Sequence, residues 1–105
     1  MAYDETLAVR IRKILGVGHD EKKMFGGWCA LRKGKMICGV LGKKLIVRCD
    51  PNDQPALIKN KGVRPMDFTG KPMRGFLYVD ARVVTKDADL KKWIVRSKAW
   101  VATKK

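Results

Sequence analysis

The sequence predicts one α+β domain, in which a helix at each end of the chain flanks a set of short antiparallel strands. Two segments, 4–15 and 86–103, carry apolar residues at helical spacing. Between them, short apolar runs alternate with glycine-containing breaks, which is typical of strands joined by tight turns. A chain of 105 residues can form a single core covered by two layers, so we expect one domain over residues 1–105.

The first helix is expected over 4–15. Asp4 can accept hydrogen bonds from the free N–H groups at its start, and apolar residues recur at i, i+4, i+7 and i+8. Gly16 and Gly18 follow the last apolar residue, and glycine readily adopts the positive φ at which a chain leaves a helix.

Three strands are expected within 22–50, with breaks at Lys33 and Gly34 and again at Gly42 and Lys43. Tight turns at these breaks favour an antiparallel meander. The glycine pair at 26–27 falls inside the first of these strands, where it indicates a β-bulge or a close backbone approach. The second strand is apolar on both faces, which predicts a central position in the sheet.

The second half of the chain predicts a short helix or turn within 51–62, a strand at "GFLYVD" (75–80) and a last helix over 86–103. Asp87 is the expected N-cap of that helix. Its back is unusually apolar and includes Val95, so we expect it to be available for a second contact.

The charge of the chain is its most unusual bulk property, with 24 Lys and Arg against 10 Asp and Glu and a formal net charge of +14. Such a field attracts polyanions, although a basic surface can also serve solubility alone. Basic residues at strand ends and turns are candidates for a rim that contacts nucleic acid: Lys22, Lys33, Lys35, Lys43, Lys44 and Arg74.

No pattern of catalytic or metal-binding residues is found. Cys29, Cys38 and Cys49 lie in apolar runs without a C-x-x-C pair, which indicates reduced core thiols. The single histidine, His19, lies in a polar turn, where a solvated side chain is expected more often than a general base. Because nucleotide-binding and nucleophile motifs are missing as well, we predict a protein that is not an enzyme and that uses no cofactor and no metal.

No apolar run approaches the roughly 20 residues of a membrane span, and the N-terminal residues do not resemble a secretion signal. We therefore expect a cytoplasmic protein of bacterial type with no membrane partner.

The segment "RPMDFTGKPMRG" at 64–75 combines prolines, glycines and basic residues. A phosphate-binding loop needs several N–H groups that converge at the start of a helix. Here Pro65 and Pro72 remove two donors and a strand follows, so the segment is interpreted as a structural connector.

Three blocks together resemble the TfoX N-terminal domain family: "KKMFGGWCAL" at 22–31, "GKMICGVLGKKLIVR" at 34–48 and "RPMDFTGKPMRGFLYVD" at 64–80. The resemblance extends roughly from the first helix to the last. Its specific motif residues, expected to shape a sheet edge and a loop, are Lys23, Met24, Phe25, Gly26, Gly27, Arg64, Pro65, Met66, Phe68, Gly70, Lys71, Pro72, Met73 and Gly75.

The resemblance implies an antiparallel sheet of about five strands with the N- and C-terminal helices packed on it, similar to secretion-chaperone-like two-layer folds. The family is named for regulators of natural competence (TfoX, also called Sxy), which are thought to act with the cyclic-AMP receptor protein. Those regulators carry a second, C-terminal helical domain, and we expect the present chain to be a stand-alone domain without one.

The resemblance therefore implies a stand-alone domain with a regulatory or interaction role in transcription and no catalysis. A protein partner or self-association is expected. The alternative is direct, largely electrostatic binding of nucleic acid.

Overall fold

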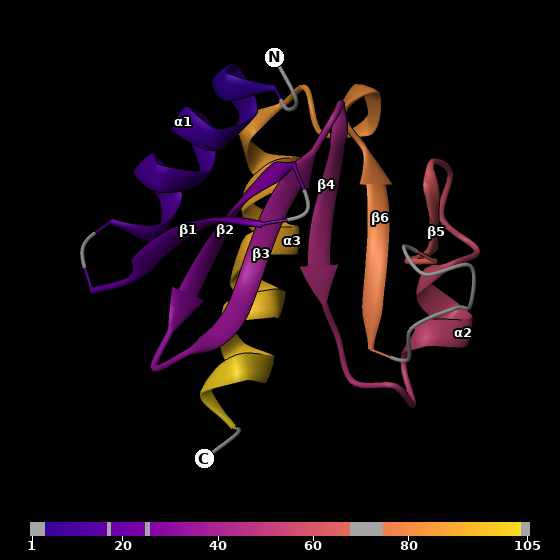
Figure 1. Ribbon diagram of the computed structural model, residues 1–105. Coiled ribbons are helices and arrows are strands. Elements are labelled where there is room, and N and C mark those ends of the chain that lie inside the picture. Colours follow the sequence, from indigo (N-terminus) through magenta and orange to yellow (C-terminus); the bar gives the residue numbers. More distant parts are fainter. Residues whose placement is uncertain (1–3, 17, 25, 68–74, 104–105) are drawn as a thin grey trace.

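The computed structural model describes residues 4–16, 18–24, 26–67 and 75–103 (Figure 1). Along the chain the elements are α1 (Glu5–Leu15), β1 (Asp20–Met24), β2 (Gly27–Arg32), β3 (Lys35–Leu41), β4 (Lys44–Arg48), α2 (Gln54–Leu57), β5 (Val63–Pro65), β6 (Phe76–Asp80), the 3-10 turn η1 (Ala81–Val83) and α3 (Asp87–Ala102).

The strands form one six-stranded sheet in the order β1-β2-β3-β4-β6-β5, and every neighbouring pair is antiparallel. Helix α3 runs across one face, behind β3 and β4 in Figure 1, and α1 packs beside α3. The predicted α+β class, the two layers and the central position of β3 are therefore confirmed. None of the described helices is long and apolar enough to cross a membrane.

The sheet has six strands against the roughly five expected, because the glycine pair at 26–27 makes a turn and not a bulge and because Val63–Pro65 forms the short edge strand β5. Met24 pairs with Gly27 across that turn, and Gly26 has a φ of 75°. The segment expected to be one strand is thus the hairpin of β1 and β2. The expected close approach does occur at Gly27, where an added methyl group would lie 2.3 Å from the carbonyl oxygen of Val40.

Helix α1 begins and ends as predicted, whereas the start of α3 differs from the prediction. The Asp4 carboxylate accepts a hydrogen bond from the Leu7 amide, and Gly16 ends α1 with a φ of 68°, as predicted. The prediction for Asp87 was wrong, because Lys86 is the N-cap of α3. Asp87 is the first residue of α3, and its carboxylate binds Arg10 of α1 at 3.0 Å, so it joins the two helices.

The main core lies between the helices and the sheet. Its largest fully buried side chains include Trp28, Ile11, Ile37, Leu45, Leu77, Leu90 and Ile94. The three cysteines are buried and free, and burial raises the pKa of each thiol. Cysteine side chains with these properties pack as small apolar groups, which agrees with the sequence interpretation.

A smaller apolar cluster lies apart from the main core and is built on Ile46, Met66 and Tyr78. Cations cover its aromatic rings. The Lys44 ammonium lies 5.0 Å and the Arg64 guanidinium 5.5 Å from the centre of the Tyr78 ring. The guanidinium of Arg48 lies 4.8 Å from the centre of the Phe76 ring. These contacts shield the rings and hold three positive charges over the β4–β6–β5 part of the sheet.

A buried hydroxyl group joins α3 to the sheet at an irregular point of β3. Ala30 pairs with Cys38 but Leu31 pairs with Met36, so Ile37 bulges out of the ladder. The Ser97 hydroxyl donates to the carbonyl of Ile37 and accepts from the amide of Arg48 at 2.7 Å. One side chain of α3 thus satisfies two backbone groups on neighbouring strands.

Glu21 joins α1 to the β1–β2 hairpin. Its carboxylate accepts hydrogen bonds from Arg12 Nε at 2.9 and 3.0 Å and from Trp28 Nε1 at 2.9 Å. The bond from Arg12, followed by that from Trp28, lowers the pKa of Glu21 from 4.5 to about 2. The Arg12 guanidinium also lies 5.1 Å from the centre of the Trp28 ring.

This cluster predicts an acid-sensitive contribution to stability. Because the folded pKa of Glu21 is depressed, its stabilisation is complete above the unfolded value of 4.5 and is lost as the pH falls towards about 2. We expect Glu21→Gln to lower the free energy of unfolding by about 1 kcal/mol near neutrality, since the carboxylate is partly exposed and screened. Urea titrations should show this deficit shrinking below about pH 4.

The matched control is Asp20→Asn at the exposed neighbouring position. Its difference from the wild type should be small at every pH. A Glu21→Gln deficit that stayed constant from neutral to acidic pH would contradict the assignment of the depressed pKa to this ion pair.

Candidate functional site

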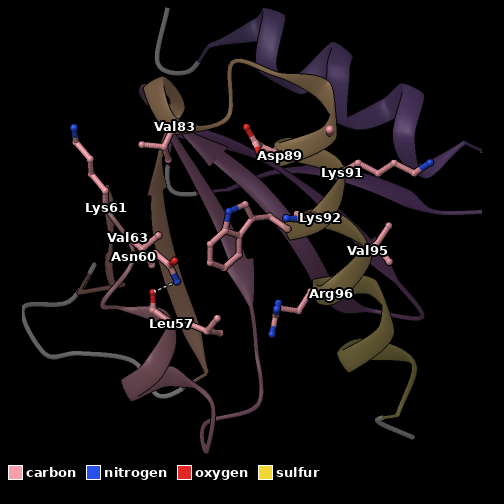
Figure 2. Close-up of a pocket in the computed structure, with 12 residues that line it drawn as sticks. Leu57, Asn60, Lys61, Val63, Val83, Asp89, Lys91, Lys92, Val95 and Arg96 are labelled. Atoms are coloured by element: carbon pink, nitrogen blue, oxygen red, sulfur yellow. Dashed lines mark hydrogen bonds between the residues drawn. The ribbon is translucent and has the colours of Figure 1, made fainter.

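A hollow of about 930 Å³ lies between α3 and the segment that joins α2 to β5 (Figure 2). This volume is in the range of ligand-binding clefts. We call it the α3 groove. Its lining residues are Leu57, Asn60, Lys61, Val63, Val83, Ala88, Asp89, Lys91, Lys92, Trp93, Val95 and Arg96.

The wall opposite α3 is fixed by turn chemistry. Pro55 lies in the first turn of α2, where a missing N–H costs nothing, and the Asn60 side chain donates to the Leu57 carbonyl at 2.9 Å after the helix. Gly62 then takes a φ of 78°, and a methyl group there would lie 2.8 Å from a side-chain carbon of Val83. The close approach of Gly62 to Val83 places the start of β5 against η1, next to the end of the groove that Val83 lines.

The floor of the groove is apolar and continuous with the core. Leu57 and Val63 are buried members of the main core, and half-buried Val83 and Trp93 pack against it. A partly exposed tryptophan in a concave site is a common anchor for a partner, since its ring gives a large contact area at little entropic cost. The groove thus offers apolar surface that the domain itself does not cover completely.

The rim of the groove is basic. Its charged residues are four cations, Lys61, Lys91, Lys92 and Arg96, and one acid, Asp89. Figure 2 shows Lys61 and Arg96 on opposite walls, whereas Lys91 and Val95 point away on the far side of α3. Val95 is 51% exposed, so the predicted apolar back of the last helix is present next to the groove.

The basic rim expected from the sequence is not gathered in one place. Lys33 and Lys35 lie at the β2–β3 turn, and Lys43 and Lys44 lie at the β3–β4 turn. Seven residues of β3 separate the two turns, which is about 20 Å of extended chain. The two pairs therefore lie at opposite ends of the sheet, and a single short nucleic-acid contact would not reach both.

The first motif block lies at one edge of the sheet. Lys22, Lys23 and Met24 belong to the edge strand β1, Gly26 makes the turn, and Gly27 starts β2 against β3. Phe25 lies outside the described residues.

The second motif block begins in the opposite edge strand, β5, which contains Arg64 and Pro65. Met66 is buried in the small cluster, and Gly75 has a φ of 81° and donates to the Gln54 side chain at 2.9 Å. Gln54 thereby ties α2 to the start of β6. The remaining residues of this block lie outside the described part of the chain: Phe68, Gly70, Lys71, Pro72, Met73 and Arg74.

The sequence of these blocks decides the family. The model of the TfoX N-terminal domain matches residues 17–100. The chain belongs to the TfoX N-terminal domain family. Comparison with curated proteins and with solved structures found no match. In this TfoX N-terminal domain, the matched region contains every residue that lines the α3 groove.

The groove was not predicted as a site. Trp93 and Lys92 are neighbours in the segment predicted to be the last helix, but the sequence does not show that 57–63 packs opposite them. One feature of the sequence could have indicated the groove. Trp93 follows Lys92 on an amphipathic helix, so its ring is expected to be buried on one side and exposed on the other. Such a tryptophan lies at the boundary of the apolar face, where partial exposure is common.

Proposed function

We propose that this TfoX N-terminal domain is a non-catalytic interaction module of transcriptional regulation, and that the α3 groove binds an acidic amphipathic helix of a partner protein. The observation that carries the proposal is an apolar floor enclosed by a basic rim. Trp93 and Val63 offer contacts to apolar side chains, while Lys92 and Arg96 favour acidic neighbours. A helix with both kinds of side chain on one face complements both properties.

Direct binding of nucleic acid is the second candidate. It is favoured by the net charge of +14 and by the cations Lys44, Arg48 and Arg64 held over the rings of the sheet. Since those rings are already covered by cations, this candidate rests on phosphate contacts and not on base stacking. It therefore predicts affinity that falls steeply with salt.

A binding experiment separates the two candidates. The probe is a fluorescein-labelled model helix of leucine and glutamate heptads, followed by anisotropy as the domain is added. We expect the double variant Lys92→Glu and Arg96→Glu to bind it about tenfold more weakly or worse, because two attractive contacts become repulsive. The control is Lys33→Glu with Lys43→Glu, which changes the net charge equally but lies outside the groove.

Equal weakening by both double variants would contradict the groove as the binding site, since only net charge would then matter. Labelled duplex DNA forms a second arm, at about 50 and 200 mM salt. Binding to DNA that persists at the higher salt and discriminates between sequences would favour the second candidate over the first.

A further inference from the structure

His19 is placed differently from the expectation of a solvated turn residue. Its side chain is only 9% exposed, because residues from α1, the sheet and α3 surround it. Neither ring nitrogen has a hydrogen-bond partner among the described residues. A buried polar group without a partner is costly, so each such group in a folded protein requires an explanation.

One neighbour of the imidazole is the Glu21 carboxylate, which already forms an ion pair with Arg12. His19 Nε2 lies 3.5 Å from Glu21 Oε2. Glu21 also accepts the hydrogen bonds of Arg12 and Trp28, so it is ionised and neutralised by Arg12 at 2.8 Å. The Glu21 carboxylate therefore faces one edge of the imidazole while it is already held by Arg12 and Trp28.

The imidazole also lines a small cavity of about 110 Å³. The other lining residues come from the end of α1 and the residues after it, from β2, β3 and α3: Leu15, Gly18, Arg32, Ile37 and Lys98. The charged members of this lining, Arg32 and Lys98, are both cations. The cavity shares no lining residue with the α3 groove.

We propose that this cavity binds a phosphate oxyanion. The polar side chains that line it are an imidazole, a guanidinium and an ammonium, which can all donate hydrogen bonds and can all carry positive charge. Its volume is the share of about three to four water molecules in liquid water, which suits a small anion. An oxyanion there would give the imidazole a hydrogen-bond partner besides the Glu21 carboxylate, which lies 3.5 Å from Nε2.

The test uses the fact that His19 is the only histidine of the chain. Its imidazole resonances are followed by NMR while sodium phosphate replaces sodium chloride at fixed pH and ionic strength. We expect a saturable shift of the His19 signals. Arg32→Gln and Lys98→Gln should each weaken phosphate binding about tenfold or more, since each removes a charged hydrogen-bond donor.

The control is Lys91→Gln, which removes an exposed charge from the same helix without touching this cavity. It should leave the midpoint unchanged. A shift that grows linearly without saturation, or one that all three variants weaken equally, would overturn the proposal, since either result indicates general charge screening.

A further arm identifies the source of the phosphate. A short single-stranded oligonucleotide is titrated with and without a 5′-phosphate. If only the phosphorylated form shifts His19 at lower concentration than free phosphate, the site recognises a terminal phosphate group. If free phosphate is bound more tightly than both, the ligand is a small free anion. No saturable effect of any of the three probes would overturn the proposal.

Discussion

Gly27→Ala is expected to lower the free energy of unfolding by about 3 kcal/mol or more, which is a large part of the stability of a small domain. The added methyl carbon would lie 2.3 Å from the carbonyl oxygen of Val40 and 3.4 Å from the Cα of Leu41. Both contacts are with backbone, so no side-chain rotation relieves them. Strands β2 and β3 would have to separate next to Trp28, which is fully buried.

The matched control is Gly34→Ala in the β2–β3 turn. Gly34 has a φ of 79° but no atom lies within 4 Å of an added methyl group, so only the backbone strain of about 1–2 kcal/mol is expected. Equilibrium unfolding in urea, followed by tryptophan fluorescence, measures both variants. If Gly27→Ala cost no more than Gly34→Ala, the close approach of β2 to β3 at this point would be wrong.

The elements set by local chemistry could be predicted from the sequence. Asp4 and Gly16 mark the two ends of α1 because capping and positive φ involve only nearby residues. The central position of β3 followed from its apolar residues on both faces. These predictions needed no knowledge of distant contacts, and the structure confirms them.

Features decided by a distant partner could not be predicted in the same way. A glycine pair inside an apolar run is compatible with a bulge and with a two-residue turn, and only the pairing of Met24 with Gly27 distinguishes them. Asp87 was equally ambiguous. Its carboxylate suits an N-cap, but Arg10, which lies 77 positions earlier, binds it instead. Asp87 is itself the first helical residue, and its carboxylate takes part in a tertiary ion pair.

The candidate sites also combine features that local sequence predicts with features that depend on distant contacts. Lys61 and Arg96 line opposite walls of the α3 groove although nothing in their local sequence relates them (Figure 2). The basic residues at the turns are a different case, because the predicted meander already determines which turns lie at the same end of the sheet. Successive turns of an antiparallel meander lie at alternate ends of the sheet, so Lys33 and Lys43 had to be far apart. A nucleic-acid contact that used both turns would therefore have to span the length of a strand.

The excess of basic over acidic residues also indicates what kind of partner this domain can bind. The ion pairs that arginines form within the described structure join Arg10 to Asp87, Arg12 to Glu21 and Arg82 to Asp80. A chain with 10 acids and 24 basic residues has too few carboxylates to pair every cation. Part of the remaining positive charge lies over the sheet, around the α3 groove and beside His19, where an anionic partner can neutralise it.

Ser97→Ala is the second substitution with a large expected effect, about 2–4 kcal/mol of unfolding free energy. The Ser97 side chain is fully buried, and its hydroxyl serves both the Ile37 carbonyl and the Arg48 amide. Alanine removes both hydrogen bonds and leaves both backbone groups without partners beneath α3. The expected loss of unfolding free energy therefore reflects two buried backbone groups left without a partner, which is more than the net contribution of one hydrogen bond.

Thr103→Ala provides the matched loss of a hydroxyl group, since Thr103 is exposed at the end of α3 and bonds only to the Trp100 carbonyl among the contacts described for it. Its effect should stay within about 0.5 kcal/mol.

Amide hydrogen exchange gives an independent measure. The Arg48 amide should lose protection in Ser97→Ala, while the amide of Val47, a residue of the β3–β4 ladder, should be affected less. A variant of wild-type stability with a protected Arg48 amide would show that another group, such as a water molecule, can replace the hydroxyl. The bulge at Ile37 would then not depend on α3, and the helix would be held to the sheet by apolar packing alone.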